Sequence, residues 1–384
     1  MDSYAVSLRR ELHENAEIGF DLPKTLAILR RELDTLGVEY TEKYGKSSIV
    51  ATVNPEKSGF TIAVRSDTDG LPINEENDVP YRSKTPGIMH ACGHDVHTAI
   101  AMETLRRVYA MRDELSCRVK FIFQAAEEYA PSGAKLMAED GVMEEVDCAV
   151  ALHVDSGLDV GELGVRVGDM NAISDGFLLK FYGKSEHAAR QHRGVDAIMI
   201  AMSAFSQIEA MLSKCIDGRE ALVFNVGSIH GGEANNIVCD ECVMYCTLRT
   251  YEDEVAERAI GMIKRICEAT ASGWGGSFEF VEKKHYPKVT NDAAVTEAVR
   301  KALIATVGED RVFTTDRGLG GEDFGYFARL KPGCMFRLGI SNRDKGIIHG
   351  VHTGKFDIDE RAIDIGINAF INFIIENQNG IIGI

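Results

Sequence analysis

Apolar positions recur along the chain with two different spacings. Apolar residues at helical spacing predict two helices within residues 4–37, the second ending at Gly37, and a further helix is predicted for residues 96–110. Short apolar runs bounded by polar turns predict strands instead. These runs cover residues 47–54, 60–65, 118–123 and 147–153. Strands and helices in this arrangement are typical of an α/β domain.

The pattern is interrupted near residue 172 and returns near residue 290. The part between has the order strand, helix, strand, strand, helix, strand, at residues 177–182, 195–213, 221–230, 241–250, 251–269 and 277–282. That order fits a ferredoxin-like α+β insert. Beyond it, helices are predicted at 293–306, 324–330 and 360–377 and a strand at 335–339. We therefore expect one α/β domain, residues 1–173 and 287–384, interrupted by a smaller domain at 174–286.

Acidic and imidazole groups follow three of the predicted strands. Asp67 and Asp69 come directly after the second strand, Glu127 and Glu128 follow the third, and the fourth ends in His153. Open α/β sheets place their sites at the carboxyl ends of strands. This repetition is the strongest pattern in the sequence, and it predicts a site built from several loops.

The densest cluster of ligand-type residues lies at Met89–Ala99. It places a thiol, three imidazoles and a carboxylate within the nine residues His90–Thr98. Unpaired buried polar groups cost free energy, whereas thiolate and imidazole are ligands for zinc and similar ions. We expect Cys92 and His94 on the loop before the third helix, with Gly93 allowing a tight backbone. A buried cysteine beside capping polar residues is the alternative.

Glu127 and Glu128 add carboxylates to these candidate ligands. Adjacent side chains on a strand diverge, so one carboxylate could bind a metal ion while the other takes a proton from water. A solvated acidic pair opening a loop is the alternative. His352, in a glycine-flanked loop before the last helix, could supply one more ligand, and His349 is equally placed on spacing alone.

Charge and cysteine content narrow the class of protein. The net charge of -17 over 384 residues argues against a nucleic-acid or anionic-membrane partner. Nine scattered cysteines suggest reduced thiols and a cytoplasmic setting. The single CxxC, Cys239 to Cys242, lacks the second pair of a structural zinc site and is interpreted as packing. The sequence also shows no signal-peptide pattern and no apolar run of membrane-spanning length.

Taken in order, the motifs resemble those of the M20 metallopeptidase family. More narrowly they are similar to its amidohydrolase branch, which includes N-acyl amino acid, hippurate, auxin-conjugate and aminobenzoyl-glutamate hydrolases. The resemblance runs from about residue 7 to about residue 375. Its motifs are Arg-x-Asp-x-Asp-Gly-Leu-Pro at 65–72, His-Ala-Cys-Gly-His-Asp-x-His-Thr at 90–98, Gln-x-Ala-Glu-Glu at 124–128, the strand-end His153, Gly-Gly-x-Ala-x-Asn at 231–236 and Gly-Glu-Asp-Phe at 321–324.

The resemblance implies two divalent metal ions per chain. Cys92 matches the bridging ligand, and Glu127 matches the general base that activates the bridging water. The other positions that match ligands are His94, Glu128, His153 and His352. Zinc, manganese, cobalt and nickel all remain open. Asp67, Asp69, Asp95 and His97 are interpreted as groups that support the ligands.

The resemblance also implies that the inserted domain is a lid and dimerisation domain beside an α/β domain with helices on both faces of a mixed sheet. His187 matches the lid histidine that helps to hold the developing oxyanion, in the family at times in the partner subunit's site. Asn236 and Arg249 match groups that bind the substrate carboxylate. The family usually has Gly-Gly where this chain has Ser185 and Glu186, so the lid loop departs from the family's pattern at these two positions.

The expected function is metal-dependent hydrolysis of the amide bond of an N-acyl amino acid, releasing a carboxylate and a free amino acid. We expect a small-molecule substrate and a homodimer formed through the inserted domain. A dipeptidase or carboxypeptidase with the same residues is the first alternative. A non-catalytic metal- or ligand-binding protein is the second, and the presence of Glu127 disfavours it.

Overall fold

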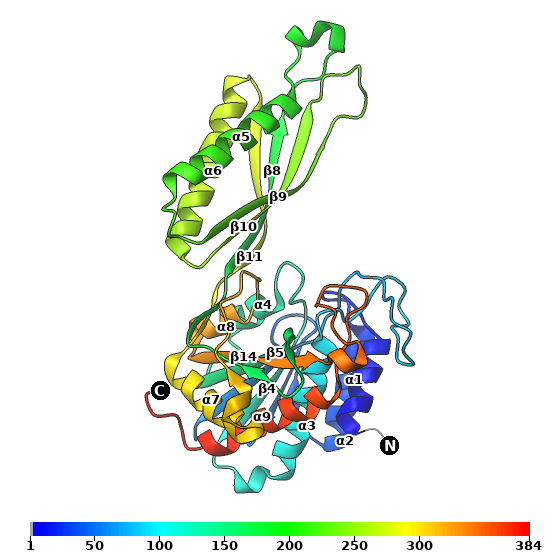
Figure 1. The fold of residues 1–384 in the computed structure, drawn as a ribbon, viewed down its shortest axis with the longest axis vertical. Coiled ribbons are helices and arrows are strands. Elements are labelled where there is room, and N and C mark those ends of the chain that lie inside the picture. The colour runs from blue at the N-terminus through cyan, green and yellow to red at the C-terminus, as the bar shows by residue number, and fades with distance from the viewer. Residues whose placement is uncertain (1–2) are drawn as a thin grey trace. The chain divides into compact units, whose positions relative to one another are not determined.

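The computed structural model describes residues 3–384, which form two compact units (Figure 1). The smaller unit comprises Asn171–Lys288 together with Gly318–Glu322. The larger unit comprises the remaining segments, Met1–Met170, Val289–Arg317 and Asp323–Ile384. The boundaries expected from the sequence were 173/174 and 286/287, and the short segment Gly318–Glu322 of the smaller unit was not expected.

The larger unit is built on an eight-stranded mixed sheet. Strands β4, β3, β5 and β14 lie next to one another and run parallel, while β2 is antiparallel to β4 and β6 is antiparallel to β14. In spatial order the strands are β1 (Tyr40–Thr41), β2 (Ile49–Val53), β4 (Arg118–Gln124), β3 (Thr61–Asp67), β5 (Cys148–Asp159), β14 (Gly333–Ser341), β6 (Leu163–Gly164) and β13 (Val312–Phe313). Two further short strands, β7 (Gly168–Asn171) and β12 (Val289–Asn291), pair with each other.

Helices cover both faces of this sheet (Figure 1). Side chains alternate between the faces, so Ile62 and Val64 of β3 join the core beneath α3 and α9, whereas Ala63 joins the core beneath α4 and α8. The prediction of a mixed sheet between two helical layers is therefore confirmed. The helices are α1 (Tyr4–Glu14), α2 (Pro23–Leu36), α3 (His94–Ala110), α4 (Gly133–Glu139), α7 (Ala293–Val307), α8 (Gly325–Leu330) and α9 (Arg361–Asn377).

Two predicted boundaries near the candidate site were wrong. Strand β5 continues to Asp159, so His153 lies within the strand and does not end it. Helix α3 begins at His94, two residues earlier than expected, so only Cys92 lies on the preceding loop. The left-handed backbone of Gly93, with φ of 82°, forms the N-cap and allows the helix to start at once.

The smaller unit is a four-stranded antiparallel sheet covered by two helices. Its sheet order, β11-β8-β10-β9, is that of a ferredoxin-like fold, as predicted. Cys242 and Cys246 of β10 alternate with exposed positions and pack in the core with Cys239, so these thiols act as small apolar side chains. The elements are β8 (Ile173–Tyr182), α5 (Ala197–Cys215), β9 (Leu222–Gly231), β10 (Glu241–Thr250), α6 (Asp253–Gly273) and β11 (Ser277–Tyr286).

Within residues 3–384, no helix combines the length and the apolar character needed to span a bilayer.

Candidate metal centre

The candidate site lies at the carboxyl ends of the parallel strands β4, β3 and β5. Asp67, the last residue of β3, pairs with Gln124, the last residue of β4. Arg65 of β3 pairs with Ala151 of β5, which places His153 at the level of Asp67. The loop that leads into α3 arrives at the same edge. Strand pairing thus brings together residues that are up to 86 positions apart in the sequence (Asp67 to His153).

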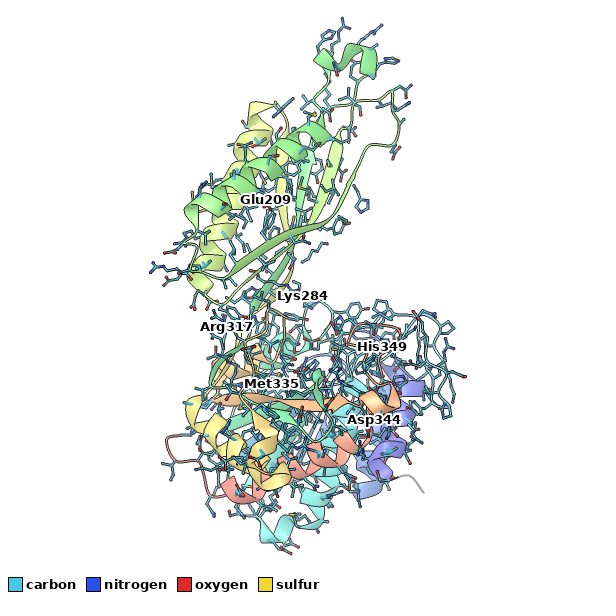
Figure 2. The ribbon with its side chains drawn as sticks, in the orientation of Figure 1. Glu209, Lys284, Arg317, Met335, Asp344 and His349 are labelled. Atoms are coloured by element: carbon cyan, nitrogen blue, oxygen red, sulfur yellow. The ribbon has the colours of Figure 1, made fainter. Side chains whose placement is uncertain are left out.

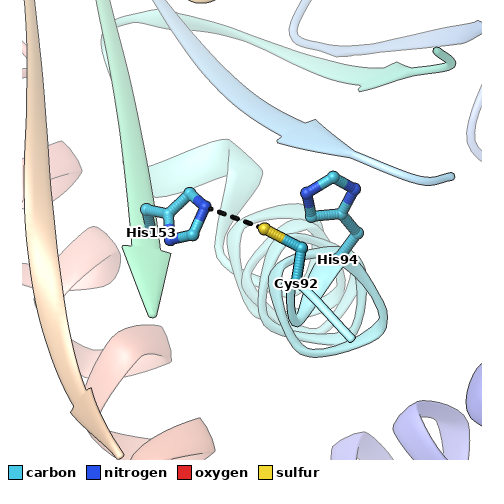
Figure 3. A group of neighbouring side chains, drawn as sticks. All are labelled: Cys92, His94 and His153. Carbon is cyan, nitrogen blue, oxygen red and sulfur yellow. Dashed lines mark hydrogen bonds between the residues drawn. The ribbon is translucent and has the colours of Figure 1, made fainter. Parts of the chain in front are cut away.

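Cys92 lies between two sets of ligand atoms. The donor atoms of Cys92, His94 and His153 lie within 4.8 Å of one another, and so do those of Cys92, Glu128 and His352. Figure 3 shows the first set, with His153 on its strand and Cys92 and His94 at the start of α3. Cys92 is thus the one residue common to both of these groups of possible metal ligands.

The His153 ring offers one free nitrogen to this thiol. Its Nδ1 donates a hydrogen bond to the carbonyl oxygen of Val154 at 2.7 Å, so Nε2 carries no proton and has a lone pair to offer. That Nε2 lies 3.4 Å from the Cys92 Sγ (Figure 3). Burial also holds the pKa of His153 well below its usual value, so the ring is neutral, as a metal ligand must be.

His94 shows most directly that the residues fit a metal ion. Its side chain is fully buried, yet within the described chain neither ring nitrogen has a hydrogen-bond partner. The nearest carboxylates are Asp69, 3.5 Å from Nδ1, and Asp67, 3.7 Å from Nε2. Burial alone would lower the pKa of His94, but the charge of Asp67 raises it overall. A cation bound at this imidazole would satisfy the ring and balance the surrounding negative charge.

Cys92 completes a donor set of sulfur, nitrogen and oxygen. Burial raises the pKa of its thiol, so the sulfur is protonated until a cation displaces the proton. Thiolate, imidazole and carboxylate together suit zinc and also admit manganese, cobalt or nickel. The donors therefore fit divalent metal ions.

Glu127 and Glu128 reach the site because the chain turns sharply after β4. Ala126 has a positive φ of 54°, uncommon for a residue with a side chain. The two oxygens of Asp69 accept hydrogen bonds from the backbone N–H groups of Glu127 (2.9 Å) and Glu128 (3.2 Å). Both carboxylates then lie in one donor group with His94. From the sequence, the two adjacent side chains were expected to diverge. They converge instead, because β4 ends at Gln124 and residues 127 and 128 follow a turn.

His352 is brought to the site by an unusual backbone conformation. Its φ is 63°, and its N–H donates to the carbonyl oxygen of Ala91 at 2.7 Å. Its Nε2 lies 3.1 Å from Glu128 Oε1. His349, on the same loop (Figure 2), is exposed and belongs to no donor group among residues 3–384. Geometry therefore favours His352 over its neighbour.

Asp67 and His97 support the ligands. His97 Nδ1 donates to Asp67 at 2.6 Å, and its Nε2 accepts from the backbone N–H of Val154 at 3.0 Å. Both ring nitrogens are thereby used, so His97 ties Asp67 to the strand beside His153. Arg65 donates to Asp67 at 2.8 Å and to Gln124 at 2.9 Å, which ties β3 to β4. The role of Arg65 was not anticipated from the sequence.

The remaining predicted site residues lie in the smaller unit. His187 and Asn236 are close together: Ala188 N–H donates to the Asn236 carbonyl oxygen at 2.9 Å. Arg249 lies near the other end of β10, where its Nη1 donates to the Leu319 carbonyl oxygen at 2.7 Å. Arg249 lies eight positions along the strand from Glu241, which corresponds to about 26 Å. The three residues therefore form two separate groups within one chain.

The site defines a class of protein, one that binds divalent ions next to buried carboxylates at the edge of an α/β sheet. Comparison with known proteins supplies the family. A protein-family model described as Peptidase family M20/M25/M40 matches residues 63–376 of the chain. The chain belongs to this family and is a metal-dependent amidohydrolase, which confirms the resemblance seen in its motifs.

Three relatives illustrate the range of the family. N-acetylcysteine deacetylase of Bacillus subtilis is 32% identical over 366 residues, covering 95% of this chain and 94% of that protein. Thermostable carboxypeptidase 2 of Saccharolobus solfataricus is 34% identical over 385 residues, covering 99% and 96%. The crystal structure of Bacillus subtilis YXEP, described as a dinuclear metal binding peptidase from the M20 family, matches with a TM-score of 0.80 at 29% identity, covering 97% of each chain.

Gly93 provides a test of the ligand loop. A Cβ at this position would lie 2.6 Å from Val154 Cγ2, and the residue needs a positive φ. We expect Gly93→Ala to displace Cys92 and His94 and to weaken zinc binding by about 10- to 100-fold, the usual effect of disturbing a ligand's support. Zinc affinity is measured by competition with a chromogenic chelator.

The matched control for this variant is Gly37→Ala. Gly37 has a similar φ of 71°, but a Cβ there meets nothing within 4 Å. It should share the backbone strain of about 1–3 kcal/mol and keep its zinc affinity. Equal zinc affinities for the two variants would contradict the placement of the ligand loop.

Proposed function

We propose that the chain hydrolyses the amide bond of an N-acyl amino acid and releases a carboxylate and a free amino acid. The observation that carries this proposal is the position of Cys92 in two donor sets, with Glu127 beside them. When bound, divalent ions at these donors lower the pKa of water and polarise a carbonyl oxygen. The proposed ligands are Cys92, His94, Glu128, His153 and His352.

Glu127 is proposed as the general base. Its side chain is almost fully buried, and its carboxylate lies in a donor group with His94 and Glu128. The hydrogen bond from its backbone N–H to Asp69 fixes the start of this turn. From there the carboxylate takes a proton from the attacking water and returns it to the leaving nitrogen. General acid–base catalysis of this kind contributes about 10²–10⁴-fold to the rate.

Arg249 is proposed to bind the substrate carboxylate. Its side chain is partly buried, and burial lowers the pKa of its guanidinium. Within residues 3–384 it forms no ion pair; its one hydrogen bond is to the carbonyl oxygen of Leu319. A partly desolvated guanidinium without a counter-ion is suited to bind an anion, and its fork matches the two oxygens of a carboxylate.

His187 and Asn236 are proposed to hold the carbonyl oxygen and carboxylate of a substrate bound to the partner subunit. The end of β10 that leads to these residues, at Glu241, lies about 26 Å of strand away from Arg249, which is too far for one small molecule to span within a protomer. Strand β9 forms an open edge of the sheet and exposes Val223 and Ile229. Open apolar strand edges favour pairing with another chain, which supports a homodimer formed through the smaller unit.

A carboxypeptidase or dipeptidase acting with the same residues is the second candidate. It is favoured by the 34% identity to a protein named thermostable carboxypeptidase 2. A carboxypeptidase also needs to bind a free carboxylate, so Arg249 would serve both reactions. The two candidates differ in the group on the other side of the amide bond, an acyl group or a peptide.

The proposed function is tested with a panel of N-acetyl and N-benzoyl amino acids, dipeptides and longer peptides. Release of free amine is measured on enzyme stripped with a chelator and on enzyme refilled with zinc, manganese, cobalt or nickel. We expect turnover only after refilling and only on N-acyl amino acids with a free carboxylate. Amidated substrates should react poorly, and Arg249→Gln should remove that preference. Preferred cleavage of peptides would establish the second candidate instead.

Glu127→Gln separates the proposed base from the ligands. The variant keeps the size of the side chain but cannot accept the proton, so kcat should fall by about 10²–10⁴-fold while the bound metal stays constant. Metal content is measured by mass spectrometry of dialysed protein. Glu128→Gln is the control and should lose metal. Turnover by Glu127→Gln at the normal rate would remove Glu127 from the mechanism.

Mixing two inactive variants tests the shared site. Glu127→Gln and His187→Ala should each be inactive as homodimers, but a mixed dimer combines an intact Glu127 with the partner's intact His187. After exchange of subunits we expect about a quarter of the normal activity, because half of the dimers are mixed and each has one complete site. Absence of recovery, with sedimentation showing mixed dimers, would place His187 in the site of its own chain.

A further inference from the structure

Helix α1 carries two buried cationic side chains that the proposed reaction does not use. Arg9 and His13 are four residues apart on one face of α1, and both are almost fully buried. Arg9 Nε donates to Asp95 Oδ2 at 2.8 Å, and His13 Nδ1 donates to the same oxygen at 2.8 Å. Asp95 follows His94 directly in the first turn of α3. Helix α1 is thus tied to the residue next to a proposed ligand.

His13 also reaches the irregular segment 72–88, which contains neither helix nor strand. Its Nε2 lies 3.3 Å from Glu75 Oε1, so each ring nitrogen faces a carboxylate. Burial lowers the pKa of His13, but Asp95 outweighs this and raises it overall. Tyr81 of the same segment packs with its ring centre 4.8 Å from the Arg9 guanidinium carbon. The two cations therefore hold this segment against α1.

Segment 72–88 is also hydrogen-bonded to the loop that carries His352. Glu76 N–H donates to the Gly354 carbonyl oxygen at 2.7 Å, and Asn77 Nδ2 donates to the Phe356 carbonyl oxygen at 2.7 Å. Beyond this loop, Arg9 lies 3.4 Å from carboxylate oxygens of both Asp357 and Glu360.

The two ligand-bearing segments are therefore both held by α1. One is the Cys92–His94 segment, held through Asp95, and the other is the His352 loop, held through Asp357, Glu360 and segment 72–88. Within residues 3–384, only one backbone hydrogen bond links the two segments directly, from the His352 N–H to the Ala91 carbonyl oxygen. His352 also has a positive φ, a conformation that needs support from its surroundings.

We propose that Arg9 and His13 are positioning residues that set the separation between the Cys92–His94 segment and the His352 loop, and so the affinity of the site for its second divalent ion. The second ion needs ligands from both segments, because Cys92 shares its second donor set with Glu128 and His352. Breaking the contacts of α1 leaves each segment folded but lets the distance between Cys92 and His352 vary. This inference rests on the ligand set proposed above, and it does not depend on the substrate.

The test compares the zinc affinities of Arg9→Met, His13→Gln and Asp95→Asn by competition with a chromogenic chelator. We expect the first zinc ion to bind nearly normally and the second to bind about 10- to 100-fold more weakly, as when a ligand's support is removed. With cobalt, the thiolate charge-transfer absorption should keep its one-ion intensity and fail to increase at the second equivalent. In turnover, kcat should fall while KM stays nearly constant. Arg9→Lys, which keeps the charge but not the fork, extends the test if Arg9→Met does not fold.

A double variant shows whether Arg9 acts through Asp95. If it does, Arg9→Met with Asp95→Asn should lose no more zinc affinity than the more affected single variant. Leu12→Ala, in the core side of α1, is the control for lost stability and should keep both zinc affinities.

Two outcomes would overturn the inference. One is binding of the second zinc ion within twofold of normal in Arg9→Met (or Arg9→Lys) and in His13→Gln. The other is an equal loss of affinity in Leu12→Ala, which would mean that α1 contributes stability alone. Failure of the ligand set itself is recognised separately, because Cys92→Ala would then keep both ions.

Discussion

The hydrogen bonds of two carboxylates, Asp67 and Asp69, hold the metal centre together. Asp67 ends β3 and accepts from Arg65 and His97, and His97 in turn accepts from the backbone beside His153. Asp69 accepts from the backbone N–H groups of Glu127 and Glu128. Ligands on β5 and on the loop after β4 are thereby positioned from one short stretch after the central strand. These bonds are made by ionised groups away from water, where they are strongest.

Burial of so many ionisable groups imposes a second constraint. Burying an isolated charge costs free energy, so each buried ionisable group must either lie beside an opposite charge or be in its neutral form. Asp67 and Asp95 face Arg65, Arg9 and His13 and have pKa values well below the usual range, even though burial opposes this. Burial raises the pKa of Cys92 and lowers the pKa of His153, so both groups remain neutral. Cys92 and His153 are proposed ligands, whereas Asp67 and Asp95, which support the site, are already paired with cations.

In the smaller unit, the residues proposed to bind substrate lie in two separate places. Strand β10 keeps Arg249 near one end and leads at its other end to the turn with Asn236 and His187. A strand of this length cannot bring both groups to one small substrate. This separation underlies the proposal of a substrate site shared by two chains, and β9 is an edge strand of the sheet.

The sequence by itself determined the α/β class, the ferredoxin-like insert and most of the candidate ligands. Apolar spacing is a local property, and Cys92, His94 and Glu127 lie in dense local motifs, so each can be recognised without long-range contacts. It misplaced the end of β5 and the start of α3, because strand pairing and the left-handed Gly93 decide these boundaries. Only the tertiary structure separated His352 from His349 and joined Arg9 and His13 to Asp95, since these choices depend on residues about 80 or more positions apart that meet through packing.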